Sequence, residues 1–240
     1  MLLEENMNIS LMASFADTFN KVFIKDERWK LYLSGLGNTI VISLIAITIG
    51  VIIGLLIAVV KNVNINTGKL MLLTKIGDLY VTIIRGIPMM LQLFIVYFAI
   101  LASWKNANIV ASIAFGLNSG AYVAEIFRSG LLSIDKGQME AGRSLGLSYG
   151  KTMAKIIVPQ AMRNAVPPLC NEFIALIKET AIVGAIGITD LTLASKMIGT
   201  STFEFFLPMA ISAVFYLTLV LILNMIMKLI ERRLSKGDNR

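Results

Sequence analysis

The sequence predicts an all-α integral membrane protein with five transmembrane helices. Of its 240 residues 56% are hydrophobic and only 15% are charged, and several charge-free runs are long enough to cross a bilayer. An ordinary soluble domain has about 25% charged residues, and about 20 mostly apolar residues suffice for a transmembrane helix. A soluble fold could not cover this much apolar side chain with so few charges.

Residues 1–34 precede the first predicted span. Within them, residues 9–32 carry apolar side chains at helical spacing, with charged residues opposite. We expect an amphipathic helix lying in the membrane interface, the alternative being an arm packed on the helical bundle. Glu4 and Glu5 stand where a signal peptide would be positive, so no cleavable signal is expected. The apolar side chains of this segment are Met12, Phe15, Phe19, Val22 and Phe23.

Four spans are predicted from runs without charge, and a fifth contains Glu172, Lys178 and Glu179. Charges inside a span usually face a protein interior or a water-filled path. The fifth segment is nonetheless expected to span, since otherwise the basic segment 127–163 and the basic C-terminus would lie on opposite sides. The predicted spans are 35–60, 80–103, 107–130, 166–189 and 208–229, within a membrane domain of residues 35–231 that a basic tail, 232–240, follows.

Small residues recur every four positions on two predicted spans, a spacing that lets helix backbones approach closely. They are Ala46, Gly50, Gly54 and Ala58 on the first span and Gly116, Gly120 and Ala124 on the third.

The net charge is +7, and the distribution of its positive residues sets the predicted topology rather than indicating a nucleic-acid partner. Fifteen of the 22 Lys and Arg fall on one predicted side and six on the other, with Lys178 inside a span. The positive-inside rule then places the N-terminus outside and the C-terminus in the cytoplasm.

The composition also bounds the chemistry. There is no histidine and a single cysteine, Cys170, which excludes a disulfide framework and argues against a zinc site. No Ser–Lys dyad or paired acids stand out, so we expect no catalytic residues, no metal and no cofactor. Asp190 and Glu204 are expected on a solvated external connection.

Residues 133–163 predict a cytoplasmic helix–turn–helix. Gln138–Leu145 reads as a short helix ended by Gly146, and a second helix starts near Ser148. Apolar side chains, Leu145 among them, form its faces. A compact hairpin of this kind is a suitable docking element for a partner protein. The run from Gly146 to Thr152 is not a phosphate-binding loop, because three residues rather than four separate its glycines and no strand precedes it.

Part of this hairpin resembles a known motif. Glu140-Ala141-Gly142, three residues, Gly146, nine residues and Ile156-Ile157-Val158-Pro159 resemble the EAA motif of permeases in binding-protein-dependent ABC importers. The usual form is Glu-Ala-Ala, three residues, Gly, nine residues, Ile-x-Leu-Pro, so this sequence departs at Gly142 and Val158. Residues 85–88 with Gln92, 121–128 and 178–180 resemble the branch that takes up polar amino acids. The resemblance covers residues 35–231.

The resemblance implies a type I ABC importer permease in a prokaryotic cell membrane. It implies a dimer, with a second copy or a sister permease, that forms the translocation pathway for a polar or basic L-amino acid. Two separate ATPase subunits would hydrolyse ATP and an external binding protein would deliver the substrate, so this chain would be a transport subunit and not an enzyme. The implied ATPase-docking residues are Glu140, Ala141, Gly142 and Gly146.

A polar stripe on the third span suggests where substrate passes. Its members are four positions, then three, then four apart, on one helix face. Glu125 could bind an ammonium or guanidinium group, and Lys178 could meet a carboxylate, although the two could instead pair with each other. Arg85 is expected to anchor to lipid headgroups or the docking region. The candidate substrate-binding residues are Asn118, Tyr122, Glu125, Lys178 and Glu179, with Ser129 completing the stripe.

Which amino acid is carried stays open, as does whether Lys178 and Glu179 face the pathway or pair structurally. A secondary transporter or channel is the main alternative. It would explain the spans and their charges without an ATPase, but it leaves the EAA spacing unexplained.

Overall fold

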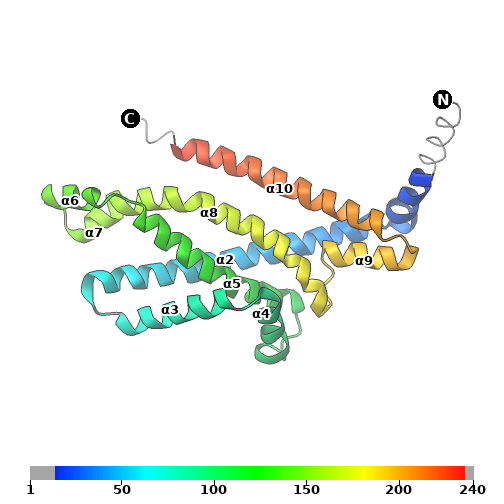
Figure 1. Ribbon diagram of the computed structural model, residues 1–240, viewed down its shortest axis with the longest axis horizontal. Helices are drawn as coiled ribbons and strands as arrows, with labels where there is room; N and C mark the ends of the chain where they lie inside the picture. The colour runs from blue at the N-terminus through cyan, green and yellow to red at the C-terminus, as the bar shows by residue number, and fades with distance from the viewer. Residues whose placement is uncertain (1–13, 236–240) are drawn as a thin grey trace. The chain divides into compact units, whose positions relative to one another are not determined.

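The computed structural model describes residues 14–235, and all regular secondary structure in that part of the chain is helical (Figure 1). Three helices, Trp29–Ile65, Ala107–Leu132 and Phe206–Arg233, are long and apolar enough to cross a membrane, and there are five spans if each of two bent helix pairs counts as one. The principal helices are α2 (Trp29–Thr67), α3 (Met71–Gly86), α4 (Met89–Ile95), α5 (Ala107–Leu132), α6 (Lys136–Ser144), α7 (Tyr149–Thr152), α8 (Val158–Glu179), α9 (Leu191–Thr202) and α10 (Phe206–Ser235).

The chain forms two compact units. One comprises Met1–Val41 and Lys178–Leu221, and the other comprises Ile42–Ile177 and Ile222–Arg240. We refer to them as the first and second unit. Helices α2, α8 and α10 contribute residues to both.

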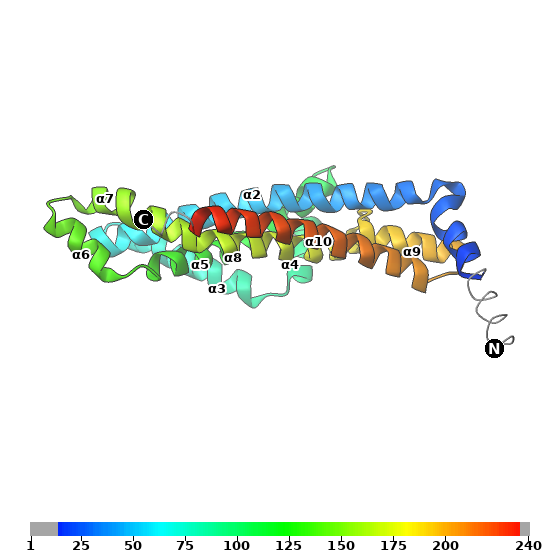
Figure 2. The ribbon, with the colours of Figure 1, turned by 90° about the horizontal axis from the view of Figure 1, so that it is seen from above.

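In the second unit, α2 and α5 approach each other through the predicted small residues. A β-carbon on Gly50 would lie 2.7 Å from Ser119 Oγ, and one on Gly54 would lie 2.7 Å from the backbone nitrogen of Ala124. Helix α3 runs back along α2 (Figures 1 and 2), where Lys61 forms an ion pair with Asp78. The small-residue spacing therefore predicted a real helix contact.

The predicted span 80–103 is not one continuous helix. The chain bends by 110° between Gly86 at the end of α3 and Met89 at the start of α4. Pro88 has no backbone N–H and holds Ile87 in an extended conformation, so α3 cannot continue. An apolar run predicts that a segment is buried in the membrane, but it does not predict whether the helix is straight. The only sequence signal for this bend is Pro88.

Two side chains stabilise this bend. Gln92 Nε2 donates to the carbonyl oxygens of Ile84 and Ile87, each at 2.7 Å, which gives the end of α3 partners for carbonyls that its own helix leaves free. Asn118 Nδ2 on α5 donates in turn to Gln92 Oε1 at 3.2 Å. The bend is thereby fixed to α5.

The segment predicted to span at 166–189 is also divided. Helix α8 ends at Glu179 and a 3₁₀ helix, Thr180–Ile186, follows before Gly187, whose φ of 80° turns the chain towards α9. The helices on either side of this turn differ in direction by 50°.

The first unit is organised around Asp190, which caps α9. Its two carboxylate oxygens accept hydrogen bonds from the backbone nitrogens of Leu193 and Thr192, both at 2.9 Å, and the Tyr216 hydroxyl donates to it at 3.3 Å. The expectation of a solvated Asp190 is wrong, because this residue is fully buried. An N-cap carboxylate next to an apolar run can be enclosed since backbone donors replace its water.

The described part of the N-terminal segment, from residue 14, packs partly on this unit. Val22 is fully buried beside Tyr32 and Leu191, whereas Phe15 is exposed, and Met12 lies outside the described residues. Positive φ angles at Asp26 and Glu27 interrupt the expected continuous helix over 9–32.

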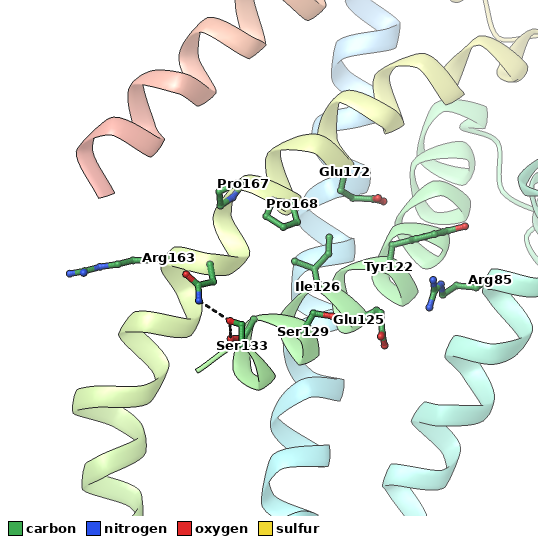
Figure 3. Close-up of a pocket in the computed structure, with 12 residues that line it drawn as sticks. Arg85, Tyr122, Glu125, Ile126, Ser129, Ser133, Arg163, Pro167, Pro168 and Glu172 are labelled. Carbon is green, nitrogen blue, oxygen red and sulfur yellow. Dashed lines mark hydrogen bonds between the residues drawn. The ribbon is translucent and has the colours of Figure 1, made fainter. Parts of the chain in front are cut away.

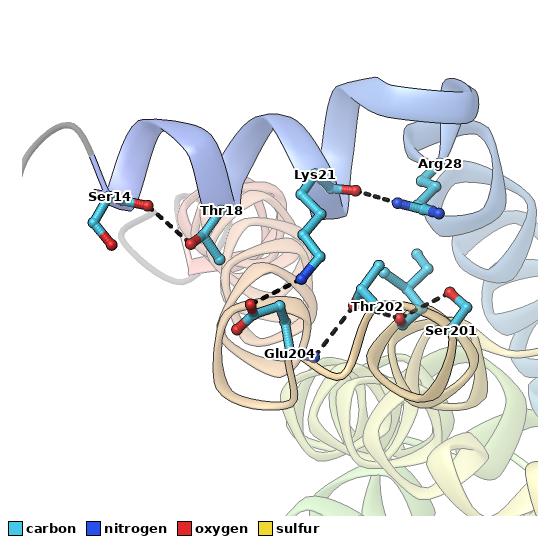
Figure 4. A network of polar contacts seen from close by, with 8 residues as sticks. Ser14, Thr18, Lys21, Arg28, Ser201, Thr202 and Glu204 are labelled. Carbon is cyan, nitrogen blue, oxygen red and sulfur yellow. Dashed lines mark hydrogen bonds and ion pairs between the residues drawn. The ribbon is translucent and has the colours of Figure 1, made fainter.

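A salt bridge also ties this segment to the rest of the first unit. Lys21 pairs with Glu204 at 3.1 Å, and Figure 4 shows the two side chains pointing at each other from the N-terminal segment and from the turn before α10. The segment thus combines both alternatives from the sequence. Val22 packs as an arm on the bundle would, and Phe15 is exposed as on an amphipathic helix in the membrane interface.

Candidate functional site

A polar pocket of about 730 Å³ lies in the second unit between α3, α5 and α8 (Figure 3). It brings together charged groups of both signs, hydroxyl groups and two consecutive prolines. Its lining residues are Arg85, Tyr122, Glu125, Ile126, Ser129, Gly130, Ser133, Arg163, Asn164, Pro167, Pro168 and Glu172.

Helix α5 supplies the carboxylate side of the pocket. Glu125 forms an ion pair with Arg128, three residues later on the same helix, and Arg128 Nε lies 2.9 Å and 3.0 Å from the two carboxylate oxygens. Glu125 is half-buried, so one side of its carboxylate is held by its own helix while it lines the pocket.

Arg85 on α3 faces the same pocket, contrary to its expected role at the headgroups or the docking region. Its guanidinium carbon lies 5.3 Å from the centre of the Tyr122 ring, within the range of a cation–π contact. Figure 3 shows the Arg85 and Glu125 side chains close together. Sequence analysis missed this residue because the bend at Pro88, rather than any spacing rule, sets where α3 ends.

Helix α8 supplies acceptors. Pro167 and Pro168 have no backbone N–H, so the carbonyl groups of Arg163 and Asn164, four residues earlier, lack their usual helical donors. The Asn164 side chain donates from Nδ2 to Ser133 Oγ at 2.7 Å, which connects α8 to the end of α5. Carbonyl oxygens on this wall can accept hydrogen bonds from an N–H-rich ligand group.

The structure divides the five predicted substrate residues. Tyr122 and Glu125 line the pocket together with Ser129, but Asn118 does not, since it is 4% exposed and bonded to Gln92. Lys178 and Glu179 are exposed and belong to the first unit.

The arrangement favours binding over catalysis. The Arg85 guanidinium and the carboxylates of Glu125 and Glu172 line one pocket, so a ligand that carries both charges can find partners for each. No group of three or more His, Cys, Asp or Glu residues in the described chain could hold a metal ion.

The second candidate site is the hairpin of α6 and α7, which lie side by side in Figures 1 and 2. Helix α6 ends as predicted at Gly146, whose φ is 80°. Leu147 N donates to the Gly142 carbonyl at 3.1 Å and Gly146 N to that of Arg143 at 3.0 Å, the paired bonds of a Schellman motif. A glycine is needed because other residues rarely adopt this left-handed conformation.

The hairpin exposes most of its EAA residues. Glu140, Ala141 and Gly146 are exposed, whereas Gly142 is buried against Thr152. A β-carbon at Gly142 would lie 2.5 Å from Thr152 Cγ2, so the glycine that replaces the usual alanine of the motif matches a threonine packed directly against it.

Leu145 is a further candidate for partner docking. The sequence placed it on the apolar faces of the hairpin. Its side chain is 81% exposed at the end of α6. With the exposed Glu140 and Ala141 on the same short helix, it makes this end of the hairpin a candidate interaction surface.

A bundle of helices long and apolar enough to cross a membrane, with a polar pocket between them and an exposed helical hairpin, is typical of a membrane transport component. Residues 50–236 match the family model for the "binding-protein-dependent transport system inner membrane component". The chain belongs to this family and is a multi-pass membrane permease.

Known relatives agree with this assignment. The chain is 40% identical over 209 residues to the arginine transport system permease protein ArtQ of Bacillus subtilis, which covers 86% of this chain and 93% of ArtQ. It is 34% identical over 216 residues to the L-cystine transport system permease protein TcyB of the same organism, over 89% of this chain and 90% of TcyB.

Solved structures share the fold. The crystal structure of an amino acid ABC transporter with histidines matches with a TM-score of 0.77 and 38% identity, over 85% of this chain and 94% of that chain. An inward-facing structure of the MetNI methionine ABC transporter matches with a TM-score of 0.73 at 21% identity, over 88% of this chain and 99% of that chain, which shows the fold alone.

Proposed function

We propose that this permease is the membrane-spanning subunit of an ATP-driven amino-acid importer that carries a polar or basic L-amino acid. The observation that carries the proposal is the EAA-spaced hairpin, which presents Leu145 and Glu140 to solvent in a chain of this family. A secondary transporter would have no use for such a surface.

Docking of an ATPase subunit is assigned to the exposed end of α6. The Schellman turn at Gly146 and the buried contact of Gly142 with Thr152 make the hairpin rigid. Glu140, Ala141 and Leu145 then form one small surface of an acid beside apolar groups. A rigid hairpin transmits a movement of the partner better than a flexible loop does, because less of that movement is lost in local rearrangement.

Substrate binding is assigned to the polar pocket. The relatives described above are named for arginine or L-cystine transport or were solved with histidines, and all three amino acids carry an α-amino and an α-carboxylate group. Arg85 is suited to the carboxylate, and Glu125 is suited to ammonium or guanidinium groups. Lys178 and Glu179 are proposed to face the pathway in the assembled transporter, where their exposed side chains would find partners.

The assembly follows from the same proposal. Two permease chains would line the pathway, two ATPase subunits would bind the two hairpins, and an external binding protein would deliver substrate to the side that carries the N-terminus. The permease domain is proposed to span residues 35–231 in the cell membrane, with the C-terminus in the cytoplasm.

A co-purification experiment tests the docking surface. The tagged permease is co-expressed with its ATPase subunit as wild type, as Glu140→Arg and as Leu145→Asp. We expect both variants to reach the membrane and to lose most of the ATPase. Lys136→Gln, at the other end of α6, is the matched control and should retain it. Normal co-purification with both variants would contradict the docking assignment.

A further inference from the structure

A second cavity in the second unit has a chemistry opposite to that of the polar pocket. It measures about 400 Å³, lies between α2, α8 and α10, and is lined by apolar side chains and one thiol. Its lining includes Ile47 on α2, Leu169, Cys170 and Phe173 on α8, and Met227 and Ile230 on α10.

The size of this groove limits what can fill it. An α-helix with its side chains is about 10–12 Å wide and rises 1.5 Å per residue, so two turns of a partner helix would occupy on the order of 700 Å³ or more. A helix from another chain could therefore cover this groove but not fill it. A single flexible hydrocarbon chain is narrow enough, and the groove offers it apolar contacts along its length.

Cations flank one end of the groove. On α10, Lys228, Arg232 and Arg233 are exposed beside and just beyond Ile230, and on α8 Arg163 is exposed one turn before the lining residue Val166. The one acid in this turn of α10 is Glu231, so the cluster is positive overall.

Arg163 lines the polar pocket, but its side chain is directed away from it. Figure 3 shows its guanidinium pointing away from Arg85 and Glu125. A guanidinium that leaves the polar pocket at the basic end of the apolar groove is placed to meet a phosphate group.

We propose that this groove binds one acyl chain of an anionic phospholipid, whose phosphate contacts the basic cluster Arg163, Lys228, Arg232 and Arg233. The C-terminal end of α10 then lies at the leaflet that the positive-inside rule assigns to the cytoplasm, where anionic lipids attract clustered Lys and Arg. The lipid would act as a filler between α8 and α10.

The only cysteine of the chain makes this testable, because Cys170 lines the groove and is partly accessible. The assembled complex is placed in nanodiscs of phosphatidylcholine alone or with phosphatidylglycerol, and reaction of Cys170 with N-ethylmaleimide is followed by mass spectrometry of the permease chain. We expect labelling to be several-fold slower with phosphatidylglycerol.

The double variant Arg232→Gln with Arg233→Gln should remove this protection, weakening the preference for phosphatidylglycerol on the order of tenfold. Lys69→Gln with Lys75→Gln, which also removes two positive charges, is the matched control and should keep it. Native mass spectrometry should find one phosphatidylglycerol retained per wild-type permease chain and fewer in the double variant.

Equal labelling rates in both lipids, together with equal lipid retention in the double variant, would overturn the proposal. Protection in lipid-free detergent that is lost on dilution would also overturn it, since a second protein chain would then cover the groove. Neither readout requires transport, so the outcome is independent of the importer assignment.

Discussion

Glu125 and Arg128 form an ion pair on one face of α5, with the guanidinium Nε 2.9 Å and 3.0 Å from the two carboxylate oxygens. The sequence left Glu125 to bind a substrate cation or to pair with Lys178, whereas its ion-pair partner in the structure is Arg128. The pair holds the carboxylate in place at the wall of the polar pocket, where a substrate cation could share it.

Replacing Glu125 tests this role. Glu125→Gln keeps the size of the side chain but removes the charge, and a hydrogen bond to a charged group contributes about 1.5–3 kcal/mol. We expect uptake at low substrate concentration to fall roughly tenfold or more, measured with radiolabelled substrate in proteoliposomes, while the complex still assembles.

Glu204→Gln is the control for the loss of one acid, because its exposed ion pair with Lys21 lies in the other unit and such pairs contribute little. Uptake by Glu125→Gln at the wild-type rate would show that the ion pair with Arg128 is purely structural.

The contact between Gly142 and Thr152 makes a second prediction. Gly142→Ala places a methyl group within 2.5 Å of Thr152 Cγ2, and overpacking of this kind costs about 1–3 kcal/mol. The variant should lower ATPase co-purification and the thermal stability of the complex. Thr152→Ser removes the methyl group that would collide and keeps the hydroxyl that donates to Ser148, so the double variant should recover both properties. Failure of this rescue would show that Gly142 contacts the partner directly.

Asn118 is predicted to stabilise the bend between α3 and α4 rather than to bind substrate. Asn118→Leu leaves Gln92 Oε1 without its buried donor, a loss of about 1–3 kcal/mol. We expect a lower unfolding temperature in detergent and an unchanged KM for uptake by the protein that remains folded. A raised KM with unaltered stability would instead show that Asn118 contributes to substrate binding.

Asp190 should contribute to the stability of the first unit through its cap on α9. Asp190→Ala removes the acceptors for Thr192 N, Leu193 N and the Tyr216 hydroxyl, and loss of an N-cap alone costs about 0.5–2 kcal/mol. Asp190→Asn retains one oxygen acceptor and should be clearly milder. Thermal unfolding followed by circular dichroism would rank the variants, and equal stability of all three proteins would contradict the role of the cap.

The sequence predicted features that depend on local pattern. The predicted span 107–130 corresponds to α5, and the spacing of small residues on α2 and α5 corresponds to a close helix contact. Gly146 marked the end of α6 because a left-handed turn there has a strong residue preference.

The sequence alone could not predict features that depend on which neighbouring element covers a side chain. Asn118 and Glu125 stand on one stripe, yet the bend after α3 buries the first and leaves the second at a pocket. Arg85 and Leu145 were misassigned for the same reason, since their exposure is set by the ends of helices and not by periodicity.

ATP-driven uptake by the reconstituted complex tests the central claim most directly. Proteoliposomes that contain the permease and its ATPase are supplied with the external binding protein and a radiolabelled amino acid, with wild-type permease and Leu145→Asp compared. We predict uptake that requires ATP and the binding protein and that Leu145→Asp abolishes. Uptake that an ion gradient drives equally well without ATPase or binding protein would contradict the account and establish a secondary transporter instead.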